Sequence, residues 1–304
     1  MTGEDVFGIN REDASSPRIP YQNTETAVSA VWDYNARENS TYFKLLTGEK
    51  ETWDLTVVRN QDQAQKFMGD DGFMTAAFQK DGADGWKEVT LPMSWTRQGF
   101  DFSIYTNVTM PWQSKYDSSV SVPEAPTVYN PVGLYRKTFT VSDEMRADNR
   151  RIYISFQGVE SAYYVYVNGK EVGYSEDTYS PHRFDITDYL VDGENLLAVE
   201  VHKFCDGTWF EDQDTLYDGG IFRDVYLTSE PLVKIQDYTV RTSLDDEYVD
   251  AALSLSVDVR NLSAKAQSGW TIDVQALDEE GNNILGATSI PVTEVGPQRQ
   301  KHSL

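Results

Sequence analysis

Cysteine is nearly absent from this sequence, since Cys205 is the only one among 304 residues. An internal disulfide is therefore excluded, and with it a small disulfide-stabilised scaffold. No run approaches the roughly 20 apolar residues of a membrane-spanning helix. Residues 1–30 also lack the basic and apolar segments of a signal peptide. We expect that any export signal has been removed or never existed, which leaves cytoplasmic and secreted localisation both open.

Basic residues are scarce: 26 Lys and Arg stand against 49 Asp and Glu, for a net charge of −23. Such a chain repels nucleic acid and anionic membrane surfaces over most of its surface, whereas a neutral ligand such as a carbohydrate is compatible with it. Hydrophobic residues make up 39% and aromatic residues 12% of the chain. This is enough apolar surface for a core, so we expect a folded protein.

Motifs of several enzyme classes are also missing. The sequence contains no Walker loop, no HExxH and no GxSxG. Its histidines, His182, His202 and His302, are too far apart in sequence to indicate a local metal site, and Cys205 has no adjacent nucleophile signature. We therefore expect structural or surface roles for these residues and assign no catalytic residue.

Alternating hydrophobicity predicts an all-β fold. Ile152, Ile154 and Phe156 share one face of a predicted strand and Tyr153 and Ser155 the other, which is typical of a half-buried strand. Leu197, Val199 and Val201 form the same pattern, and so do two later sets: Leu253, Leu255, Val257 and Val259, then Ile272, Val274 and Ala276. Residues 1 to about 45 lack such periodicity, and we interpret them as an extended arm.

Two turn signals organise these strands. Asn168-Gly169 lies between the predicted strands 163–167 and 170–174, and this dipeptide is the strongest short hairpin signal, here for a type I′ turn. Ser229-Glu230-Pro231 interrupts the pattern before it restarts. We therefore predict one domain over residues 1–228 and a second β-sandwich over 229–304. The second domain looks incomplete, because an immunoglobulin-like sandwich takes about 100 residues.

The richest acidic segment covers residues 205–214 and is followed by Asp218-Gly219-Gly220. Carboxylates interleaved with aromatic rings suit sugars, since rings cover the apolar faces of a pyranose and Asp or Gln bind its hydroxyls. The carboxylate oxygens of this segment also suit a hard cation. Composition alone favours a third interpretation, a solvated acidic loop. Glu211 and Asp214 could be proposed as a glycosidase acid pair, but their spacing does not give the required carboxylate separation.

A second polar and aromatic cluster extends from Pro92 to Trp112. It contains Trp95 and Trp112. Tryptophans in such positions more often pack in the core or against loops than stack on a ligand, and we expect this of both. Asn107-Val108-Thr109 matches an N-glycosylation acceptor, but three residues of pattern carry little weight.

A series of motifs resembles the N-terminal region of bacterial β-galactosidases of glycoside hydrolase family 2. The series runs in order over about residues 90–228 and comprises Ser94-Trp95, Gly99-Phe100-Asp101, Ile104-Tyr105-Thr106-Asn107-Val108-Thr109, Gly133-Leu134-Tyr135-Arg136, Phe156-Gln157-Gly158-Val159-Glu160-Ser161-Ala162, Val167-Asn168-Gly169, Val172-Gly173-Tyr174-Ser175, Gly193-Glu194-Asn195, Glu211-Asp212-Gln213-Asp214 and Gly220-Ile221-Phe222-Arg223-Asp224-Val225. Gly8-Ile9-Asn10-Arg11 is similar to the family's N-terminal extension.

The resemblance implies a sugar-binding jelly-roll β-sandwich, then an immunoglobulin-like β-sandwich, then a (β/α)₈ barrel whose two glutamates act by a retaining mechanism. The barrel is not within these residues, so the resemblance implies that this chain alone is inactive. It implies substrate-binding roles for Asn107 and Asp214 in a largely enclosed site, a sodium ion through Asp214, and Mg²⁺ only in the barrel. It also allows a homo-oligomer of the full-length enzyme.

Two departures from the family pattern stand out. The Trp that follows the Glu-Asp-Gln-Asp motif is not matched, because Thr215-Leu216-Tyr217 follows Asp214. Residues 47–90 match poorly, and we interpret Met68 to Asp84 as a surface insert. Three alternatives stay open: the same architecture in a β-glucuronidase or β-mannosidase, a free-standing carbohydrate-binding module, and a purely structural domain.

Overall fold

The structure is a computed structural model that describes residues 6–31, 33–80, 85–113, 116–211, 213–286, 288–297 and 299–303. Contacts divide the chain into two compact units. The first comprises residues up to 12, 43–145 and 152–228, and the second comprises 13–42, 146–151 and the residues from 229 onward. No helix of the described residues is long and apolar enough to cross a membrane.

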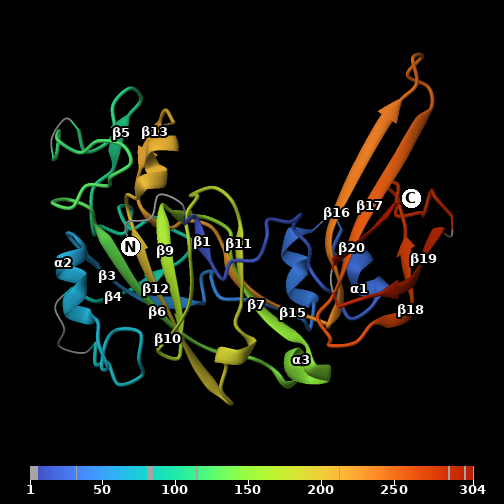
Figure 1. The fold of residues 1–304 in the computed structure, drawn as a ribbon, viewed down its shortest axis with the longest axis horizontal. Coiled ribbons are helices and arrows are strands. Elements are labelled where there is room, and N and C mark those ends of the chain that lie inside the picture. The colour runs from blue at the N-terminus through green and yellow to red at the C-terminus, as the bar shows by residue number, and fades with distance from the viewer. Residues whose placement is uncertain are drawn as a thin grey trace. The chain divides into compact units, whose positions relative to one another are not determined.

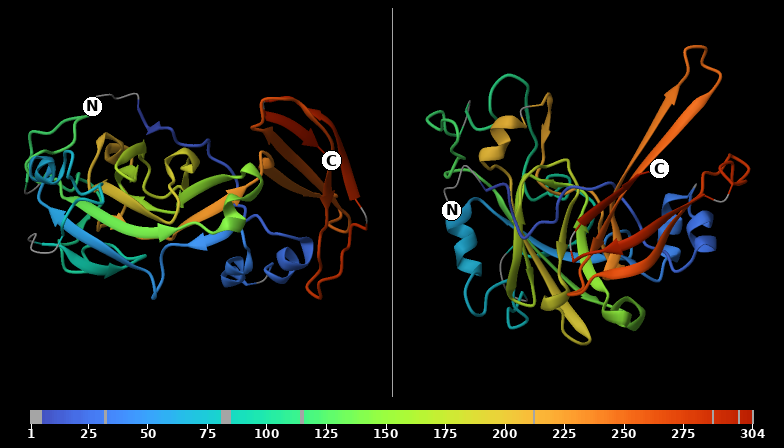
Figure 2. Two further views of the ribbon diagram at one scale, coloured as in Figure 1. Left: turned by 90° about the horizontal axis from the view of Figure 1, so that it is seen from below. Right: turned by 45° about the vertical axis from the view of Figure 1, so that its right-hand side comes forward.

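The first unit is a β-sandwich of a seven-stranded and a four-stranded sheet (Figures 1 and 2). The larger sheet has the order β1 (Gly8–Ile9), β10 (Lys170–Ser175), β9 (Ala162–Val167), β12 (Glu194–His202), β6 (Val132–Thr140), β3 (Thr52–Val58) and β4 (Lys87–Thr90). The smaller has the order β11 (His182–Asp185), β7 (Arg151–Phe156), β15 (Val225–Glu230) and β2 (Phe43–Leu45). The predicted all-β sandwich is therefore confirmed.

Short elements connect these strands. Two further ribbons pair β5 (Ile104–Thr106) with β13 (Thr215–Tyr217), and β8 (Val159–Glu160) with β14 (Gly220–Ile221). The helical elements are α1 (Thr24–Ser29), η1 (Tyr34–Asn39), α2 (Gln61–Ala64), η2 (Gln65–Phe67), α3 (Asp143–Arg146), η3 (Ala147–Asn149), η4 (Thr187–Tyr189) and η5 (Asp206–Phe210). Helix α1 and η1 lie in the segment expected to be an extended arm, so that expectation is wrong for residues 24–39.

The core of the first unit lies between its two sheets. Leu197, Val199 and Val201 of β12 are fully buried there. Trp95 packs with them, as the usual burial of tryptophan side chains predicted. The prediction that β7 is half-buried is wrong, because Tyr153 and Ser155 on its other face are also buried. The guanidinium of Arg183 lies 4.6 Å from the centre of the Tyr153 ring and covers part of that face.

The predicted hairpin at Asn168-Gly169 is confirmed. The dipeptide joins β9 to β10, with φ of 52° and 80°, and positive values at both positions are what a type I′ turn requires. Asn168 also donates a hydrogen bond of 2.8 Å to the Oδ1 atom of Asn195. On the far edge of β10, Gly173 lets β1 pair closely, since a Cβ atom there would lie 2.2 Å from the carbonyl oxygen of Ile9.

Residues 60–80 and Trp86 cover part of the outer face of the seven-stranded sheet. Phe73 is fully buried against Leu134 and Ala198 of that sheet, and Phe67, Phe78 and Trp86 pack around it. Their rings meet edge-on or tilted at 5.4–6.2 Å between centroids. Within the segment Met68 to Asp84, interpreted as a surface insert, Phe73 therefore attaches residues 68–80 to the sheet, while most of their other side chains are exposed or half-buried. Residues 81–84 lie outside the described chain.

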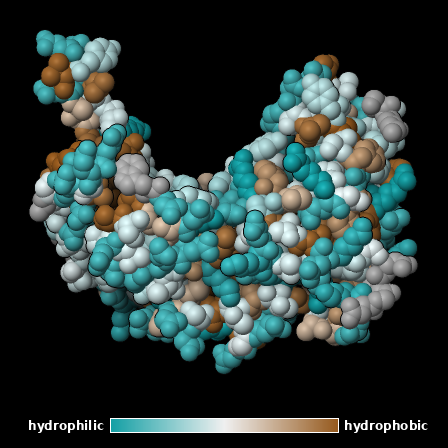
Figure 3. All heavy atoms as spheres, turned by 180° about the vertical axis from the view of Figure 1, so that it is seen from behind, coloured by the Kyte–Doolittle hydropathy of each residue, from teal (hydrophilic) through white to brown (hydrophobic). Residues whose placement is uncertain are grey.

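The second unit is also built of strands. One sheet has the order β16 (Val233–Leu244), β17 (Ala251–Asn261) and β20 (Arg299–Ser303), and β18 (Gln267–Val274) pairs with β19 (Thr288–Val295). Four valines at positions 257, 259, 292 and 295 form its core. The alternation along β17 therefore marks a buried face at Val257 and Val259, whereas Leu255 is partly buried and Leu253 is exposed. Hydrophilic residues predominate over the face of the molecule drawn in Figure 3, in keeping with the net charge of −23.

Candidate functional site

The two residues predicted to bind substrate lie at the same end of one antiparallel ribbon. Thr106 of β5 is the register partner of Thr215 of β13. Asn107 directly follows the first of these threonines and Asp214 directly precedes the second. The pairing of β5 with β13 (Figure 1) therefore places Asn107 and Asp214 next to the paired ends of two neighbouring strands, although they are far apart in sequence.

Tyr105 joins this pair. Its hydroxyl donates a hydrogen bond of 2.5 Å to the Oδ1 atom of Asp214, and this bond to a carboxylate raises the pKa of the tyrosine. The sequence placed Tyr105 inside the motif but gave it no role. The missing information was the register of the ribbon, because the two residues are 109 positions apart.

The site is open in this chain. Asn107 and Asp214 are both exposed, and apolar side chains near them are exposed too: 59% of Tyr105, 82% of Val108 and 84% of Phe210. The largely enclosed site that the resemblance implied is therefore not formed by the described residues alone. Grouped exposed apolar residues are typical of a surface that another protein segment covers.

The Glu211 carboxylate connects its segment to Thr178. It accepts hydrogen bonds of 2.7 Å from the backbone N–H and from the hydroxyl of Thr178. Burial raises its pKa, and the hydrogen bonds from Thr178 oppose this rise. Asp212 lies outside the described residues.

Asp214 and its neighbours suit a hard cation only in part. The Asp214 carboxylate and the Tyr105 hydroxyl offer oxygen ligands of the required kind. Hard cations such as Ca²⁺ take about six to eight oxygens, so most of the shell would come from water or from groups outside this ribbon. The group of three potential metal ligands found among the described residues is a different one, Glu176, Cys205 and Asp206.

A buried ion pair anchors the segment that leads into β5. The Lys203 ammonium lies 2.7 Å from the Oδ2 atom of Asp101 and also donates to the carbonyl oxygen of Phe102 at 3.1 Å. Tyr129 donates a hydrogen bond of 2.6 Å to the Oδ1 atom of Asp101. The Lys203 side chain is fully buried and that of Asp101 is 6% exposed. This anchor holds the chain six residues before Asn107.

A buried carboxyl group supports the other strand of the ribbon. The Oε2 atom of Glu160 accepts backbone N–H bonds from Asp218 at 3.1 Å and from Gly219 at 2.7 Å, just after β13 ends. Glu160 also lines a cavity of about 360 Å³, to which Leu216 of β13 contributes. Burial raises its pKa from 4.5 to about 7, although the two N–H bonds and the charge of Lys203 act in the opposite direction.

Glu160 should make stability depend on pH. Its pKa is about 7 when folded and 4.5 when unfolded, so between these values the native state holds a proton that the unfolded chain has released. Its contribution therefore falls as pH rises from about 4.5 to about 7 and is constant above. Relative to Glu160→Gln, we expect the wild type to lose up to roughly 3 kcal/mol of unfolding free energy over this range.

Denaturant unfolding of the two proteins at several pH values between about 5 and 7.5 measures this difference. Buried His182, whose pKa is lowered to about 4 mainly by burial, titrates equally in both proteins and cancels in the comparison. A difference between wild type and variant that stays constant with pH would contradict the prediction.

Comparison with known proteins supports one family. The description "Glycosyl hydrolases family 2, sugar binding domain" matches residues 60–231. The β-galactosidase of Priestia megaterium is 41% identical over 97% of this chain, and that of Clostridium acetobutylicum is 36% identical over 97%. The chain spans only 27% and 30% of the lengths of these relatives.

Solved structures share the fold at low sequence identity. A β-glucuronidase of Bacteroides uniformis aligns with a TM-score of 0.62 at 19% identity, covering 86% of this chain and 27% of that one. A structure described as a putative β-galactosidase of Bacteroides fragilis aligns with a TM-score of 0.55 at 20% identity, covering 86% and 35%. Together with the matched motifs, these likenesses lead to one assignment: the chain belongs to glycoside hydrolase family 2 and carries the sugar-binding domain of that family.

Proposed function

We propose that this chain acts as the N-terminal part of a β-galactosidase that hydrolyses terminal β-D-galactosides. The observation that carries the proposal is the ribbon that brings Asn107 and Asp214 together. The relatives named β-galactosidases match 97% of the chain. The motif resemblance implies that Asn107 and Asp214 are the counterparts of the family's galactose-contacting residues. The two catalytic glutamates belong to a barrel outside these 304 residues, where Mg²⁺ would also bind.

In this proposal the chain positions the substrate and leaves bond cleavage to the barrel. The amide of Asn107 both donates and accepts hydrogen bonds, and the carboxylate of Asp214 accepts them, so the pair can recognise sugar hydroxyls. Tyr105 holds one oxygen of Asp214, which leaves the other oxygen for substrate or for a sodium ion. The barrel glutamates would act by double displacement with retention of configuration.

The exposure of the site fits this division of work. Asn107, Asp214 and the apolar residues beside them are exposed, and a sugar gains affinity only where water is excluded on several sides. Docking of the barrel onto this surface would enclose the sugar. It would also bury apolar area that is exposed here.

Hydrolysis of nitrophenyl glycosides tests the proposal. We expect no turnover of nitrophenyl β-D-galactoside by this chain alone, and turnover by a polypeptide extended through the barrel. Turnover by the 304 residues alone would overturn the proposal that the barrel cleaves the bond and this chain only positions the substrate. The β-glucuronide is a necessary second substrate, because one of the similar structures is a β-glucuronidase. Preference of the extended enzyme for the glucuronide would replace the proposed specificity.

A further inference from the structure

A second, larger cavity lies on the outer face of the seven-stranded sheet. Its volume is about 1000 Å³. Tyr164 and Tyr166 of β9, Tyr174 of β10 and Glu200 of β12 form its floor, and they alternate with residues that face the core between the sheets. Its walls come from the N-terminal arm, from residues 61–68 and from residues 123–127. It is distinct from the ribbon that carries Asn107 and Asp214.

The cavity is lined by charge of one sign. Five carboxylates line it, and no lysine or arginine of the described chain does; the five are Asp62, Glu124, Glu176, Glu200 and Asp206. Low-dielectric walls around like charges concentrate the field and attract counter-ions. The ligand that suits this cavity therefore carries positive charge.

Glu200 is the carboxylate of this cavity that a bound cation would stabilise most. Its side chain is 3% exposed, and its Oε1 atom accepts no hydrogen bond from the described residues. Its partners among the described residues are the Tyr166 hydroxyl, which hydrogen-bonds to the carboxylate, and Nε2 of His202 at 3.2 Å, which carries charge only when the ring is protonated. Neither partner is a permanent cation, so a cation beside Glu200 would still offset part of the cost of burying its charge.

The aromatic floor specifies what kind of cation fits. The rings of Tyr164 and Tyr174 are 4.7 Å apart between centroids and inclined at 41°. Both rings line the cavity. The negative face of an aromatic ring attracts ammonium groups, with the greatest effect where the cation gives up its water. An organic ammonium ion meets rings and carboxylates together.

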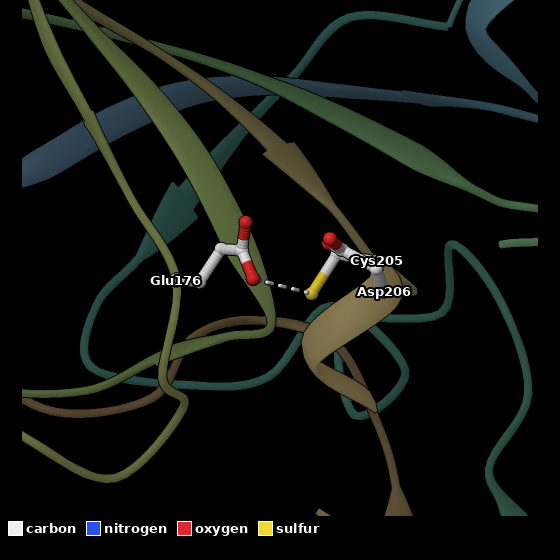
Figure 4. A group of neighbouring side chains, drawn as sticks. All are labelled: Glu176, Cys205 and Asp206. Atoms are coloured by element: carbon white, nitrogen blue, oxygen red, sulfur yellow. Dashed lines mark hydrogen bonds between the residues drawn. The ribbon is translucent and has the colours of Figure 1, made fainter. Parts of the chain in front are cut away.

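A bare metal ion fits less well. Glu176, Cys205 and Asp206 place one potential ligand atom each within 4.8 Å of one another (Figure 4). However, the carboxylate of Glu176 already accepts a hydrogen bond of 2.6 Å from Tyr174, and its other oxygen faces the Cys205 sulfur at 3.7 Å. Burial also raises the pKa of the Cys205 thiol to about 12, which disfavours the thiolate form that binds metals.

We propose that this cavity binds an organic ammonium ion, with the cationic group beside Glu200 and over the rings of Tyr164 and Tyr174. The ligand is a small amine or quaternary amine, and the binding is independent of the galactoside site. Nothing in this proposal depends on the hydrolytic activity of a longer enzyme.

Calorimetric titration with choline tests the proposal on the 304-residue protein. The matched neutral probe is 3,3-dimethylbutan-1-ol, which has the shape of choline without its charge. At about 0.15 M salt, where general attraction to the acidic surface is screened, we expect choline to bind at least roughly tenfold more tightly than the alcohol. That ratio corresponds to about 1.4 kcal/mol, within the range of desolvated cation–π contacts.

Two variants locate the site. Glu200→Gln removes the charge and keeps the shape, and we expect it to weaken choline binding roughly tenfold. Glu194→Gln makes the same change of net charge at an exposed position of β12 that does not line the cavity, and should leave binding unchanged. Tyr174→Leu removes a ring and keeps every charge. It therefore tests the site again if Glu200→Gln fails to fold by circular dichroism.

Several results would overturn the proposal. Equal affinity for choline and the alcohol would make the cavity a plain apolar site, and an equal loss in Glu194→Gln would reduce the binding to general charge attraction. Binding of Na⁺ or Ca²⁺ that displaces choline at equal concentration would point to a metal site instead. Binding of galactose that Glu200→Gln abolishes would make the cavity a second saccharide site.

Discussion

Replacement of Asp101 by alanine is expected to lower the unfolding free energy of the first unit by about 3–5 kcal/mol, as for other broken buried ion pairs. The reason is the partner left behind. Lys203 is fully buried, and without Asp101 the one hydrogen-bond acceptor left to its ammonium among the described residues is the carbonyl oxygen of Phe102 at 3.1 Å. Urea unfolding followed by tryptophan fluorescence measures the loss.

Two further variants separate the buried charge from other causes. Asp54 forms an ion pair of 2.6 Å with Lys80, but their side chains are 24% and 45% exposed, so Asp54→Ala should cost at most about 1 kcal/mol. Combining Asp101→Leu with Tyr129→Phe and Lys203→Met removes every member of the buried network and should recover most of the stability. If Asp101→Ala costs no more than Asp54→Ala, the network is not the anchor described here.

The strands with regular alternation were predictable because their apolar residues, at every second position, indicate which face of the strand is buried. Leu197, Val199 and Val201 face the core as their spacing indicated, and Asn168-Gly169 forms the turn that only residues tolerant of positive φ adopt readily. Strand β7 was harder. Alternation detects one buried face, but it cannot reveal that Arg183 covers the opposite face and buries Tyr153.

The packing of residues 60–80 and of Trp86 on the sheet was hard to predict for a related reason. Their backbone is mostly irregular, so Phe67, Phe73, Phe78 and Trp86 follow neither period two nor period 3.6. Aromatic content was the available signal, because four large rings within 20 residues are uncommon in an exposed insert.

The candidate site was reached through motif resemblance and not through periodicity. Asn107 and Asp214 could be named from their motifs, and their positions at one end of the β5–β13 ribbon are consistent with a shared role that still awaits a test. The contact of Tyr105 with Asp214 depends on the register between strands more than 100 residues apart, which no local pattern encodes. The openness of the site was also hidden, since burial of a loop depends on which other segments pack against it.

Replacement of Asp214 by alanine in the polypeptide extended through the barrel is expected to lower kcat/KM for nitrophenyl β-D-galactoside by about 10- to 150-fold. This range corresponds to the roughly 1.5–3 kcal/mol of a hydrogen bond to a charged group. Stability should change little, because Asp214 is exposed and its contact with Tyr105 lies at the surface. Steady-state kinetics together with thermal melting check both expectations.

Tyr105 provides the control that distinguishes positioning from direct contact. If Tyr105 acts by holding Asp214, then Tyr105→Phe should cost less than Asp214→Ala, and adding it to Asp214→Ala should cost almost nothing more. Additive losses would mean that Tyr105 contacts the sugar itself. A loss below twofold in Asp214→Ala would leave the ribbon a structural role only, because a carboxylate that binds a substrate hydroxyl in an enclosed site cannot be removed without a measurable cost in transition-state binding.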